Sequence, residues 1–292
     1  MYKSKILPWL FLLPLLLFVV IFLFYPFGVN IYNSFFEYTS ILDQNPKFVG
    51  FHNYISLAID QTFIHAFRNT LILIVLVLLF QVGIALILAL LVSSIKRFSS
   101  VFKVTFFMPI VISATALGLM FNLFYDYDFG MFNQLLVELG QDKVFWMDPL
   151  NLVRRYLLTM GPVIWQYIGF YFVIFLTALA GISDDILEAA DIDGCTGIQK
   201  AFRIRIPMIQ NVTRTVFILA ITGTLKVFDL PHVISPGGYP NGKLHILGTY
   251  MYEKAFNSSQ LGIAAAFAVI IAISGVVLSG ISNMILKQNK DL

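Results

Sequence analysis

The sequence predicts an all-α polytopic membrane protein with six transmembrane helices and a charged loop of two short helices between the fourth and the fifth. Hydrophobic residues make up 59% of the 292 positions and charged residues 12%, and the mean hydropathy is +0.84. A water-soluble fold of this length could not bury so much apolar surface. Long charge-free runs recur along the chain, and a charged stretch rich in helix-forming residues, Ser183–Pro207, interrupts them. These observations predict a helical membrane bundle.

A helix that crosses the hydrocarbon needs about twenty predominantly apolar residues. Charge-free runs meet that need at Ile6–Phe36, Asn69–Ile95, Val104–Tyr125, Tyr156–Ser183 and Ala255–Leu286. A further candidate, about Met208–Leu230, contains Arg214 and Lys226, but both lie near its ends, where long basic side chains reach the interface. We therefore predict six spans, of which the fifth is the weakest.

The N-terminus resembles a signal peptide because Lys3 and Lys5 precede an apolar run. However, the charge-free run is far longer than the apolar region of a signal peptide, and no small-residue cleavage site follows it. We interpret it as a retained first membrane helix. Residues 1–65 are then expected to form the first transmembrane helix and the first extracellular loop, residues 66–286 the remaining spans, and residues 287–292 a cytosolic tail.

The distribution of basic residues predicts that both termini are cytosolic, because Lys and Arg are enriched on the cytosolic side of membranes. In this orientation eleven Lys and Arg residues lie inside: Lys3, Lys5, Lys96, Arg97, Lys103, Lys200, Arg203, Arg205, Arg214, Lys287 and Lys290. Seven lie outside: Lys47, Arg68, Lys143, Arg154, Arg155, Lys243 and Lys254. The charged stretch Ser183–Pro207 then faces the cytosol, between spans four and five.

The first half of this stretch predicts a short helix with defined ends. Ser183 is expected to cap it, and Asp184 and Asp185 in its first turn complement the helix dipole. Gly194 follows the helix at the position where a left-handed residue commonly ends it.

The second half predicts another short helix. Thr196 and Gln199 have the spacing of a capping box. Pro207 is expected to restart the chain as the fifth membrane helix, at a position where its missing N–H has no cost. The whole segment Ser183–Pro207, called the bracket below, is thus predicted to be a helix–turn–helix unit.

The bracket resembles the EAA motif of binding-protein-dependent ABC importer permeases. Glu188-Ala189-Ala190 is followed after three residues by Gly194, and Gly194 is followed after nine residues by Ile204-Arg205-Ile206-Pro207, as in that family. Asp193-Gly194 and Gln199…Phe202 match the longer form of the motif. Cys195 stands where alanine is frequent and Ile206 where leucine is frequent, and both keep the size and apolarity of the position.

The resemblance implies a type I ABC importer fold in which the bracket forms the coupling helices. The residues implied in coupling to an ATPase are Glu188, Ala189, Ala190, Asp193, Gly194, Ile204 and Pro207. The implied partners are a second homologous permease subunit, two ATPase subunits that bind ATP and Mg, an extracellular solute-binding protein and membrane lipid. The chain itself would bind no cofactor and would not be an enzyme. It would lie in the plasma (inner) membrane of a bacterium or archaeon.

The alternative interpretation of the bracket is an amphipathic loop that rests on the lipid headgroups. Its five acidic residues disfavour that placement, because the inner leaflet is itself anionic: Asp184, Asp185, Glu188, Asp191 and Asp193.

Other segments resemble the carbohydrate-importer branch of the same family, in particular subunits of the MalF/UgpA type. They are Gly50-Phe51-His52-Asn53-Tyr54, Phe67-Arg68-Asn69-Thr70, Ala178-Leu179-Ala180-Gly181-Ile182, Tyr250-Met251-Tyr252 and Ala255-Phe256. The resemblance covers nearly the whole chain. It implies transport of an oligosaccharide or a sugar derivative.

The source of energy separates this interpretation from two others. The sequence contains no GxxxxGK[ST] loop, so the chain cannot cradle ATP phosphates in that way, and energy must come from a partner or an ion gradient. A self-contained ion-coupled carrier or channel is the alternative, although spans two, three, four and six carry no charge within their cores. A scaffold whose bracket recruits a cytosolic enzyme is the third.

Several other classes have no support. The net charge of +3 comes from dispersed basic residues, so nucleic-acid binding is not expected. Cys195 is the single cysteine, and the four histidines lack metal-ligand spacing, so no metal site is predicted. They are His52, His65, His232 and His245. We find no catalytic residues.

Sugars are recognised by hydrogen-bonding side chains together with aromatic faces. Candidates for the solute path are Asn122 and Tyr125 in span three, Trp165, Gln166 and Tyr171 in span four, and Phe228 and Asp229 in span five. Aromatic residues near span ends are equally typical of interfacial anchors. Lys226 and Asp229, three residues apart on one predicted helix, can also form an intrahelical ion pair.

Overall fold

The computed structural model describes residues 7–40, 43–95 and 99–285. Six of the basic residues used for the predicted orientation lie outside the described residues, as does the predicted tail 287–292: Lys3, Lys5, Lys96, Arg97, Lys287 and Lys290. Contacts divide the chain into two units. Unit 1 comprises residues 1–63 and 251–273, and unit 2 comprises residues 64–250 and 274–292. This grouping by contact does not test the boundaries after residues 65 and 286, which stay a prediction.

Unit 1 combines the N-terminal apolar helix with the start of the last long helix. Its elements are α1 (Leu7–Val19), the π-helix η1 (Val20–Phe24), α2 (Tyr25–Asn33), β1 (Phe36–Glu37), β2 (Lys47–Phe48), α3 (His52–Ile59), the start of α4 (Gln61–Leu76), the end of α15 (Leu247–Tyr252), the π-helix η5 (Glu253–Asn257) and the start of α16 (Leu261–Ile285). In the continuous helix Trp9–Asn33, the most apolar window has no buried residue within unit 1. Such a helix is built to meet lipid or another chain.

A buried amide holds unit 1 together. The side chain of Asn53 donates to the carbonyl oxygens of Ser34 and Phe36 at 2.8 and 2.9 Å. The first turn of α16 abuts the same strand, since a Cβ at Gly262 would lie 1.9 Å from the carbonyl oxygen of Phe36. Residues Phe36–Glu37 also pair antiparallel with Lys47–Phe48. These contacts fasten the N-terminal hairpin to α16.

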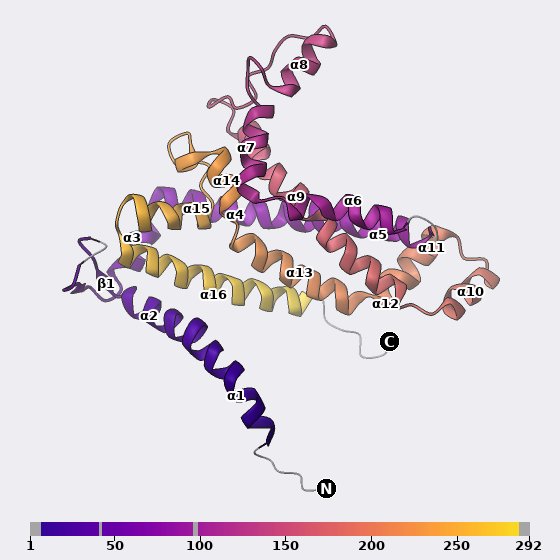
Figure 1. Ribbon diagram of the computed structural model, residues 1–292, viewed down its shortest axis with the longest axis horizontal. Coiled ribbons are helices and arrows are strands. Elements are labelled where there is room, and N and C mark those ends of the chain that lie inside the picture. Colours follow the sequence, from indigo (N-terminus) through magenta and orange to yellow (C-terminus); the bar gives the residue numbers. More distant parts are fainter. Residues whose placement is uncertain (1–6, 41–42, 96–98, 286–292) are drawn as a thin grey trace. The chain divides into compact units, whose positions relative to one another are not determined.

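Unit 2 holds most of the helices (Figure 1). Its elements are the rest of α4, the π-helix η2 (Val77–Val82), α5 (Gly83–Ser93), α6 (Ser99–Val111), α7 (Ala114–Phe124), α8 (Met131–Glu138), α9 (Leu152–Ala180), α10 (Asp184–Ile192), α11 (Gly197–Lys200), the π-helix η3 (Ala201–Arg205), α12 (Ile206–Met208), α13 (Gln210–Leu225), α14 (Asp229–Ile234), the 3-10 helix η4 (Pro236–Gly238), most of α15 and the end of α16.

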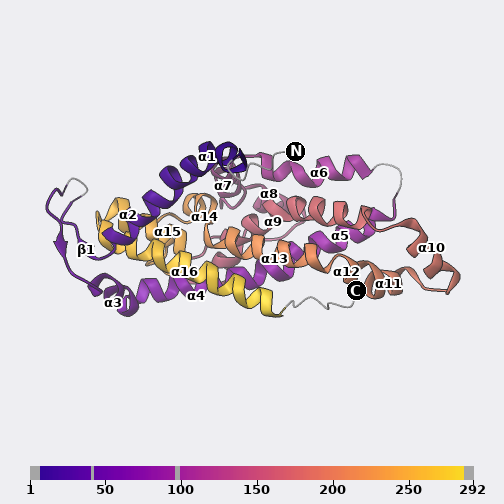
Figure 2. The ribbon, with the colours of Figure 1, turned by 90° about the horizontal axis from the view of Figure 1, so that it is seen from below.

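Helix α9 is the centre of unit 2. Helices α5 and α6 pack against it, and Figures 1 and 2 show the three side by side. The interface depends on small residues: Ala85 and Ala89 are fully buried. A Cβ at Gly169 would lie 1.8 Å from the carbonyl oxygen of Phe106, so α6 crosses α9 where no side chain fits. Small residues such as these let the backbones of two helices approach closely.

Five helices are long and apolar enough to cross a membrane within the described part of the chain. A sixth is added if α6 and α7, which are bent by 90° across Ile112 and Ser113, count as one span. The fifth span was predicted to be the weakest, and it has the lowest hydropathy of the five, but the sharp break is in span three. Its physical cause is tertiary: α7 turns to pack on α14, and a Cβ at Gly118 would lie 2.8 Å from the Cβ of Val233.

The segment after α7 is organised around one amide. Asn133 is fully buried, and its side chain donates to the carbonyl oxygens of Tyr127 and Val144, each at 3.0 Å. Its Oδ1 accepts from the backbone N–H of Val144 and the indole N–H of Trp146, each at 2.9 Å. Because both ends of the amide are satisfied, the loop has one defined shape.

Candidate functional site

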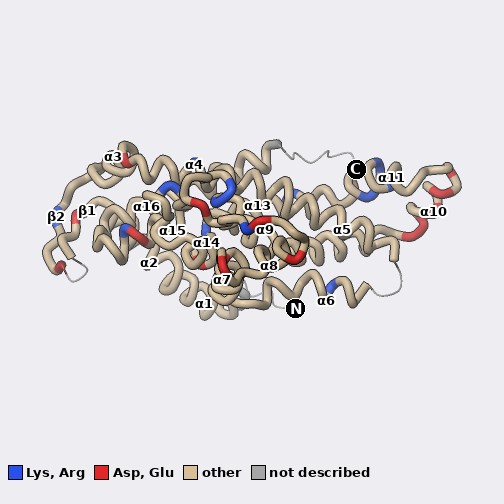
Figure 3. Tube along the Cα trace, turned by 90° about the horizontal axis from the view of Figure 1, so that it is seen from above, with Lys and Arg blue, Asp and Glu red and all other residues tan. Residues whose placement is uncertain are grey.

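Two regions of unit 2 carry the residues that the sequence predicted to be functional. The bracket helices α10 and α11 lie at one end of unit 2, and the start of its part of α4 and its part of α15 lie toward the opposite end (Figure 1). Acidic residues gather on α10 in Figure 3. The second region is a hollow within the helices between these ends.

The first bracket helix ends as predicted but begins differently. Asp184 and Asp185 occupy its first turn, whereas the hydroxyl of Ser183 makes no capping hydrogen bond, so the predicted side-chain cap is wrong. At the other end Gly194 has φ +73°. Its N–H donates to the carbonyl oxygen of Asp191 at 3.0 Å, and the N–H of Cys195 donates to that of Ala190 at 2.9 Å. This pair of bonds defines a Schellman motif, which explains the glycine.

The second bracket helix confirms the predicted capping box. Thr196 Oγ1 accepts from the N–H of Gln199 at 3.3 Å, and Gln199 Oε1 accepts from the N–H of Thr196 at 2.8 Å. Lys200 forms an ion pair with Asp191, which joins the two helices of the bracket.

The start of the fifth membrane helix differs from the prediction. The helical path continues through a π-turn, Ala201–Arg205, into the short helix that contains Pro207. The chain then leaves helical geometry at the buried residue Ile209, and α13 begins at Gln210. The restart therefore comes three residues after Pro207, because the turn that buries Ile209 separates the bracket from the span.

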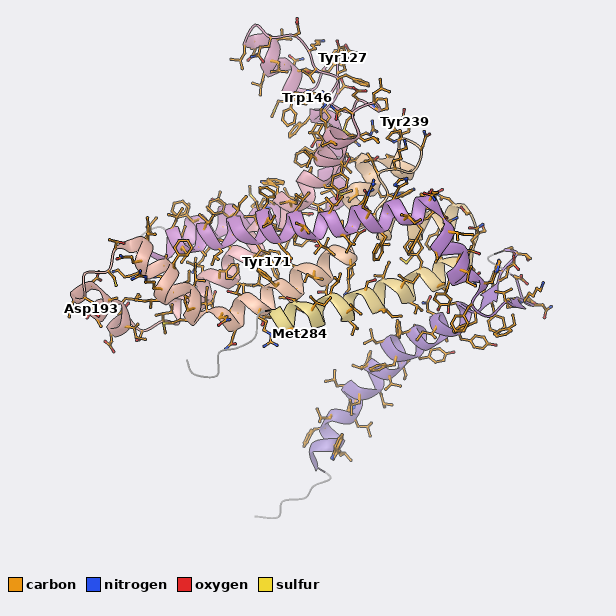
Figure 4. All side chains as sticks on the ribbon, turned by 180° about the vertical axis from the view of Figure 1, so that it is seen from behind. Tyr127, Trp146, Tyr171, Asp193, Tyr239 and Met284 are labelled. Atoms are coloured by element: carbon orange, nitrogen blue, oxygen red, sulfur yellow. The ribbon has the colours of Figure 1, made fainter. Side chains whose placement is uncertain are left out.

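The predicted coupling residues divide into exposed and packed positions. Glu188, Ala189, Asp193 and Gly194 are exposed, Ala190 is buried, and Ile204 and Pro207 are half-buried. Asp193 lies at the tip of the bracket in Figure 4. Large apolar side chains are also exposed on the bracket: Ile192 (88%), Ile198 (74%) and Phe202 (69%). Exposed apolar groups with charged neighbours are typical of a protein interface.

The hollow has a volume of about 270 Å³ and lies where two spans are broken. Ala114 follows the bend of span three, and Lys226–Phe228 separate α13 from α14. The lining comes from η2, α7, α9, α13 and α14 and comprises Val77, Gln81, Ala114, Val163, Gln166, Tyr167, Tyr171, Ala220, Gly223, Thr224, Lys226, Val227, Phe228, Asp229 and Leu230. Irregular backbone at membrane depth is tolerated where it lines a cavity.

Four residues predicted for the solute path line this hollow: Gln166, Tyr171, Phe228 and Asp229. The amide nitrogen of Gln166 donates to the carbonyl oxygen of Ile112 at 3.3 Å. This side chain therefore also pairs with a backbone carbonyl at the break in span three. The ring of Phe228 stacks on that of His232 with centroids 4.8 Å apart. Tyr171 lies midway along unit 2 in Figure 4. Contact of these four with a solute stays a prediction.

The other three predicted path residues do not line the hollow. The amide nitrogen of Asn122 donates to the carbonyl oxygen of Val233 at 3.0 Å, and the hydroxyl of Tyr125 donates to that of Leu158 at 2.8 Å. Trp165 is 42% exposed and meets Phe121 edge-on. These contacts give Asn122 and Tyr125 a structural role.

The ion pair that Lys226 and Asp229 could have formed on one helix is not present in the described part of the chain. The two residues do not share a helix. Helix α13 ends at Leu225 and α14 begins at Asp229, so the spacing of three residues does not place them on neighbouring turns. Both charges line the hollow instead.

Sequence reasoning missed other polar residues of the lining, of which Gln81 is the most informative. It lies in the π-helix η2, and within the described chain its amide has no hydrogen-bond partner. A signal was present in the sequence, because Gln81 is the only polar side chain between Leu71 and Val92. Thr224 and Tyr167 also line the hollow, and nothing in their sequence context marked them.

Comparison with known proteins agrees with this arrangement. Residues 81–290 match the family described as "Binding-protein-dependent transport system inner membrane component". The probable ABC transporter permease protein YurN of Bacillus subtilis is 30% identical over 99% of both chains. The arabinooligosaccharides transport system permease protein AraP of Halalkalibacterium halodurans is 30% identical over 95% of this chain and 86% of its own.

A solved structure shows the same fold. It is a chain of a bacterial alginate ABC transporter, crystallised in complex with an alginate pentasaccharide-bound periplasmic protein. The TM-score is 0.81 at 24% identity, over 97% of this chain and 94% of that one.

A bundle of apolar helices with a polar hollow and an exposed EAA-type bracket defines an integral membrane permease. The chain belongs to the family of inner membrane components of binding-protein-dependent transport systems. It is a permease subunit of an ATP-driven importer and not itself an enzyme. The carrier and scaffold alternatives are therefore set aside.

Proposed function

We propose that this permease carries a carbohydrate, as an oligosaccharide or sugar derivative, that an extracellular solute-binding protein delivers. The observation that supports this most directly is the composition of the hollow. It places the aromatic rings of Tyr171 and Phe228 beside the amides of Gln81 and Gln166 and the carboxylate of Asp229. Aromatic faces with a few oriented polar groups are the chemistry that binds a sugar ring and its hydroxyls. The name of the AraP relative supports the same solute class.

The bracket is proposed to be the site at which energy enters. Two ATPase subunits bind ATP and Mg, and one of them receives α10 in a cleft. Its carboxylates and exposed apolar residues form the contact, with Glu188 and Gly194 as the central positions. Closure of the ATPase dimer would move α10, and the half-buried residues Ile204 and Pro207 would transmit the motion to α13.

The complete transporter is proposed to contain a second homologous permease subunit besides the ATPases and the solute-binding protein. Both termini and the bracket face the cytosol of a bacterium or archaeon. The loops at the opposite end of unit 2 then face the binding protein. In support, the exposed Lys103, Arg203 and the half-buried Lys200 and Arg205 lie at the bracket end, as the positive-inside rule requires.

Uptake measurements on the complete transporter in proteoliposomes test the solute site. With binding protein and internal ATP, a radiolabelled arabino-oligosaccharide should enter, whereas a radiolabelled amino acid should not. Phe228→Ala and Gln166→Leu should raise the KM by about tenfold or more, because each removes part of a buried contact worth 1–3 kcal/mol. Trp165→Phe is the control outside the hollow and should leave the KM unchanged. Equal effects of all three substitutions would contradict the assignment.

Copurification tests the coupling role. The ATPase subunit should copurify with the wild-type chain and be lost with Glu188→Lys or Gly194→Pro, whereas Gly197→Ala, on the same bracket, should retain it. Proline cannot adopt the φ of +73° at Gly194. Solute uptake by the purified chain alone, driven by an ion gradient without any ATPase, would overturn the proposal.

A further inference from the structure

A second hollow lies at the bracket end of unit 2 and has a volume of about 360 Å³. It is formed by the end of α5, the start of α6, the end of α9 and the bracket. Its lining comprises Val92, Ser93, Ile95, Ser99, Lys103, Leu176, Thr177, Leu179, Ala180, Ile182, Asp184, Leu187 and Arg205. The coupling role proposed above shares only Asp184 and Leu187 of α10 with this lining and does not account for the hollow.

The polar part of the lining favours an anion. Lys103 on α6 and Arg205 on the bracket contribute two positive charges, and Asp184 contributes one negative charge. None of the three forms an ion pair within residues 7–40, 43–95 and 99–285. The hydroxyls of Ser93, Ser99 and Thr177 line the same space.

The guanidinium of Arg205 is held in place by the end of α5. Its Nη1 donates to Ser93 Oγ at 3.1 Å and to Ser94 Oγ at 3.3 Å. A guanidinium has five N–H donors, so most of them remain for a ligand. Arginine in a fixed orientation is well suited to a phosphate group, which it can bind through two parallel hydrogen bonds.

The apolar part of the lining indicates that the ligand has an acyl chain. The half-buried Ile182 and Leu187, backed by the buried Val92, Leu176 and Leu179, form a wall beside the cations. A free inorganic anion would gain nothing from such a wall, whereas a lipid would bury hydrocarbon against it.

The surface next to the hollow supports the same ligand. On α6, Val101, Val104 and Met108 flank Lys103 and are 57%, 69% and 60% exposed. A lysine next to an exposed apolar helix face is the arrangement in which the side chain reaches toward headgroups. The anionic inner leaflet attracts such cations.

We propose that this hollow binds one anionic phospholipid of the inner leaflet, with its phosphate between Lys103 and Arg205 and its acyl chain along the apolar wall. The proposal rests on the cytosolic placement of the bracket given above. The lipid would join α6 to the bracket, so that the ATPase-facing segment is held to the membrane bundle by a molecule of the membrane itself. The carboxylate of Asp184 disfavours a headgroup that carries a second acidic group besides its phosphate, because the two negative charges would repel each other.

Native mass spectrometry of the purified complete transporter, with added dioleoylphosphatidylglycerol, tests the proposal. In the Lys103→Gln/Arg205→Gln double variant, the Kd of the most tightly bound phosphatidylglycerol, the one released last as the collision energy rises, should increase by about tenfold or more. The reason is that two charge-assisted hydrogen-bonding partners are removed. The charge-matched control is Arg203→Gln/Lys243→Gln, whose side chains are exposed and do not line the hollow. It should bind the lipid as the wild type does. Lys103→Arg keeps both charges and the oriented guanidinium of Arg205 and should retain the lipid, which shows that substitution at Lys103 does not by itself disrupt the site.

Three results would overturn the proposal. The first is unchanged phosphatidylglycerol binding in the Gln double variant. The second is displacement of the lipid by inorganic phosphate at equal concentration, or equal binding of dioleoylphosphatidylcholine, because either would show a site that does not require an anionic lipid. The third is release of the lipid when the ATPase subunits bind, because the hollow would then be a protein contact. The coupling proposal and the lipid proposal can fail separately. If the coupling proposal fails, the wild-type chain copurifies without an ATPase subunit, whereas the lipid proposal is tested by the lipid that stays bound to the chain itself.

Discussion

Gly194 offers the sharpest test of how the bracket works. Its φ of +73° lies in the left-handed region, and no heavy atom lies within 4 Å of the place where a Cβ would be built. Substitution by alanine therefore meets no clash with a neighbour, and its cost comes from the backbone alone. That cost is about 1–2 kcal/mol for a residue with a Cβ. The population of the native turn, relative to alternatives, should fall by about 5- to 30-fold.

The consequence should be measurable as weaker binding of the ATPase subunit. The Schellman bonds from Gly194 and Cys195 set the direction in which the chain leaves α10. If the ATPase subunit recognises both bracket helices together, the Kd for its binding to the Gly194→Ala permease should rise by a similar factor. Gly194→Asn should have a smaller effect, because asparagine enters the left-handed region more readily than alanine. Surface plasmon resonance, with the permease immobilised and the ATPase subunit in solution, measures the Kd of both variants.

Gly197 provides the matched control. It also belongs to the bracket, has open space at its Cβ position and lies in the first turn of α11 with ordinary helical φ. Gly197→Ala should leave the Kd unchanged. A Kd for Gly194→Ala equal to the wild-type value would show that the left-handed turn does not position the bracket for the ATPase. An effect of Gly197→Ala equal to that of Gly194→Ala would show the same.

Other substitutions test the packing and the hollow. Gly169→Ala should lower the thermal unfolding midpoint of the detergent-solubilised chain, because its Cβ would lie 1.8 Å from a backbone oxygen, whereas Gly161→Ala, on the same helix with open space, should not. Asn133→Leu leaves four backbone or indole groups without their partner and should cost several kcal/mol at about 1–3 kcal/mol for each buried group. Limited proteolysis should then cut the segment around α8, and the exposed Gln134→Leu should remain resistant. Gln81→Leu should raise the KM for solute uptake without changing ATPase copurification, and an unchanged KM would exclude Gln81 from the solute site.

Much of the bracket could be predicted from the sequence because its structure depends on local interactions. The turn at Gly194 and the capping box of Thr196 and Gln199 each involve residues within five positions of one another. Such contacts form in the same way whatever the rest of the chain does. The local prediction failed at Ser183, whose hydroxyl makes no capping hydrogen bond to α10. It also failed at Pro207, because the turn that buries Ile209 places the start of the fifth span at Gln210.

The number of membrane spans could be predicted from the sequence, whereas the positions at which the spans are broken could not. Hydropathy depends on composition, so the apolar runs could be counted along the chain. The breaks in spans three and five depend on which helices meet. The 90° bend before α7 accompanies its packing against α14, a helix more than a hundred residues later in the chain. No periodicity within span three carries that information.

The membrane class and most of the bracket follow from the sequence alone, because apolar length and short-range hydrogen bonds are properties of contiguous residues. Which polar side chains line the same hollow depends instead on how the helices pack in three dimensions. Gln166, Tyr171, Phe228 and Asp229 line the hollow and Asn122, Tyr125 and Trp165 do not, although all seven are of the same chemical types. Their positions depend on where broken helices cross, and that crossing is set by close contacts between segments far apart in the sequence, such as Gly118 with Val233.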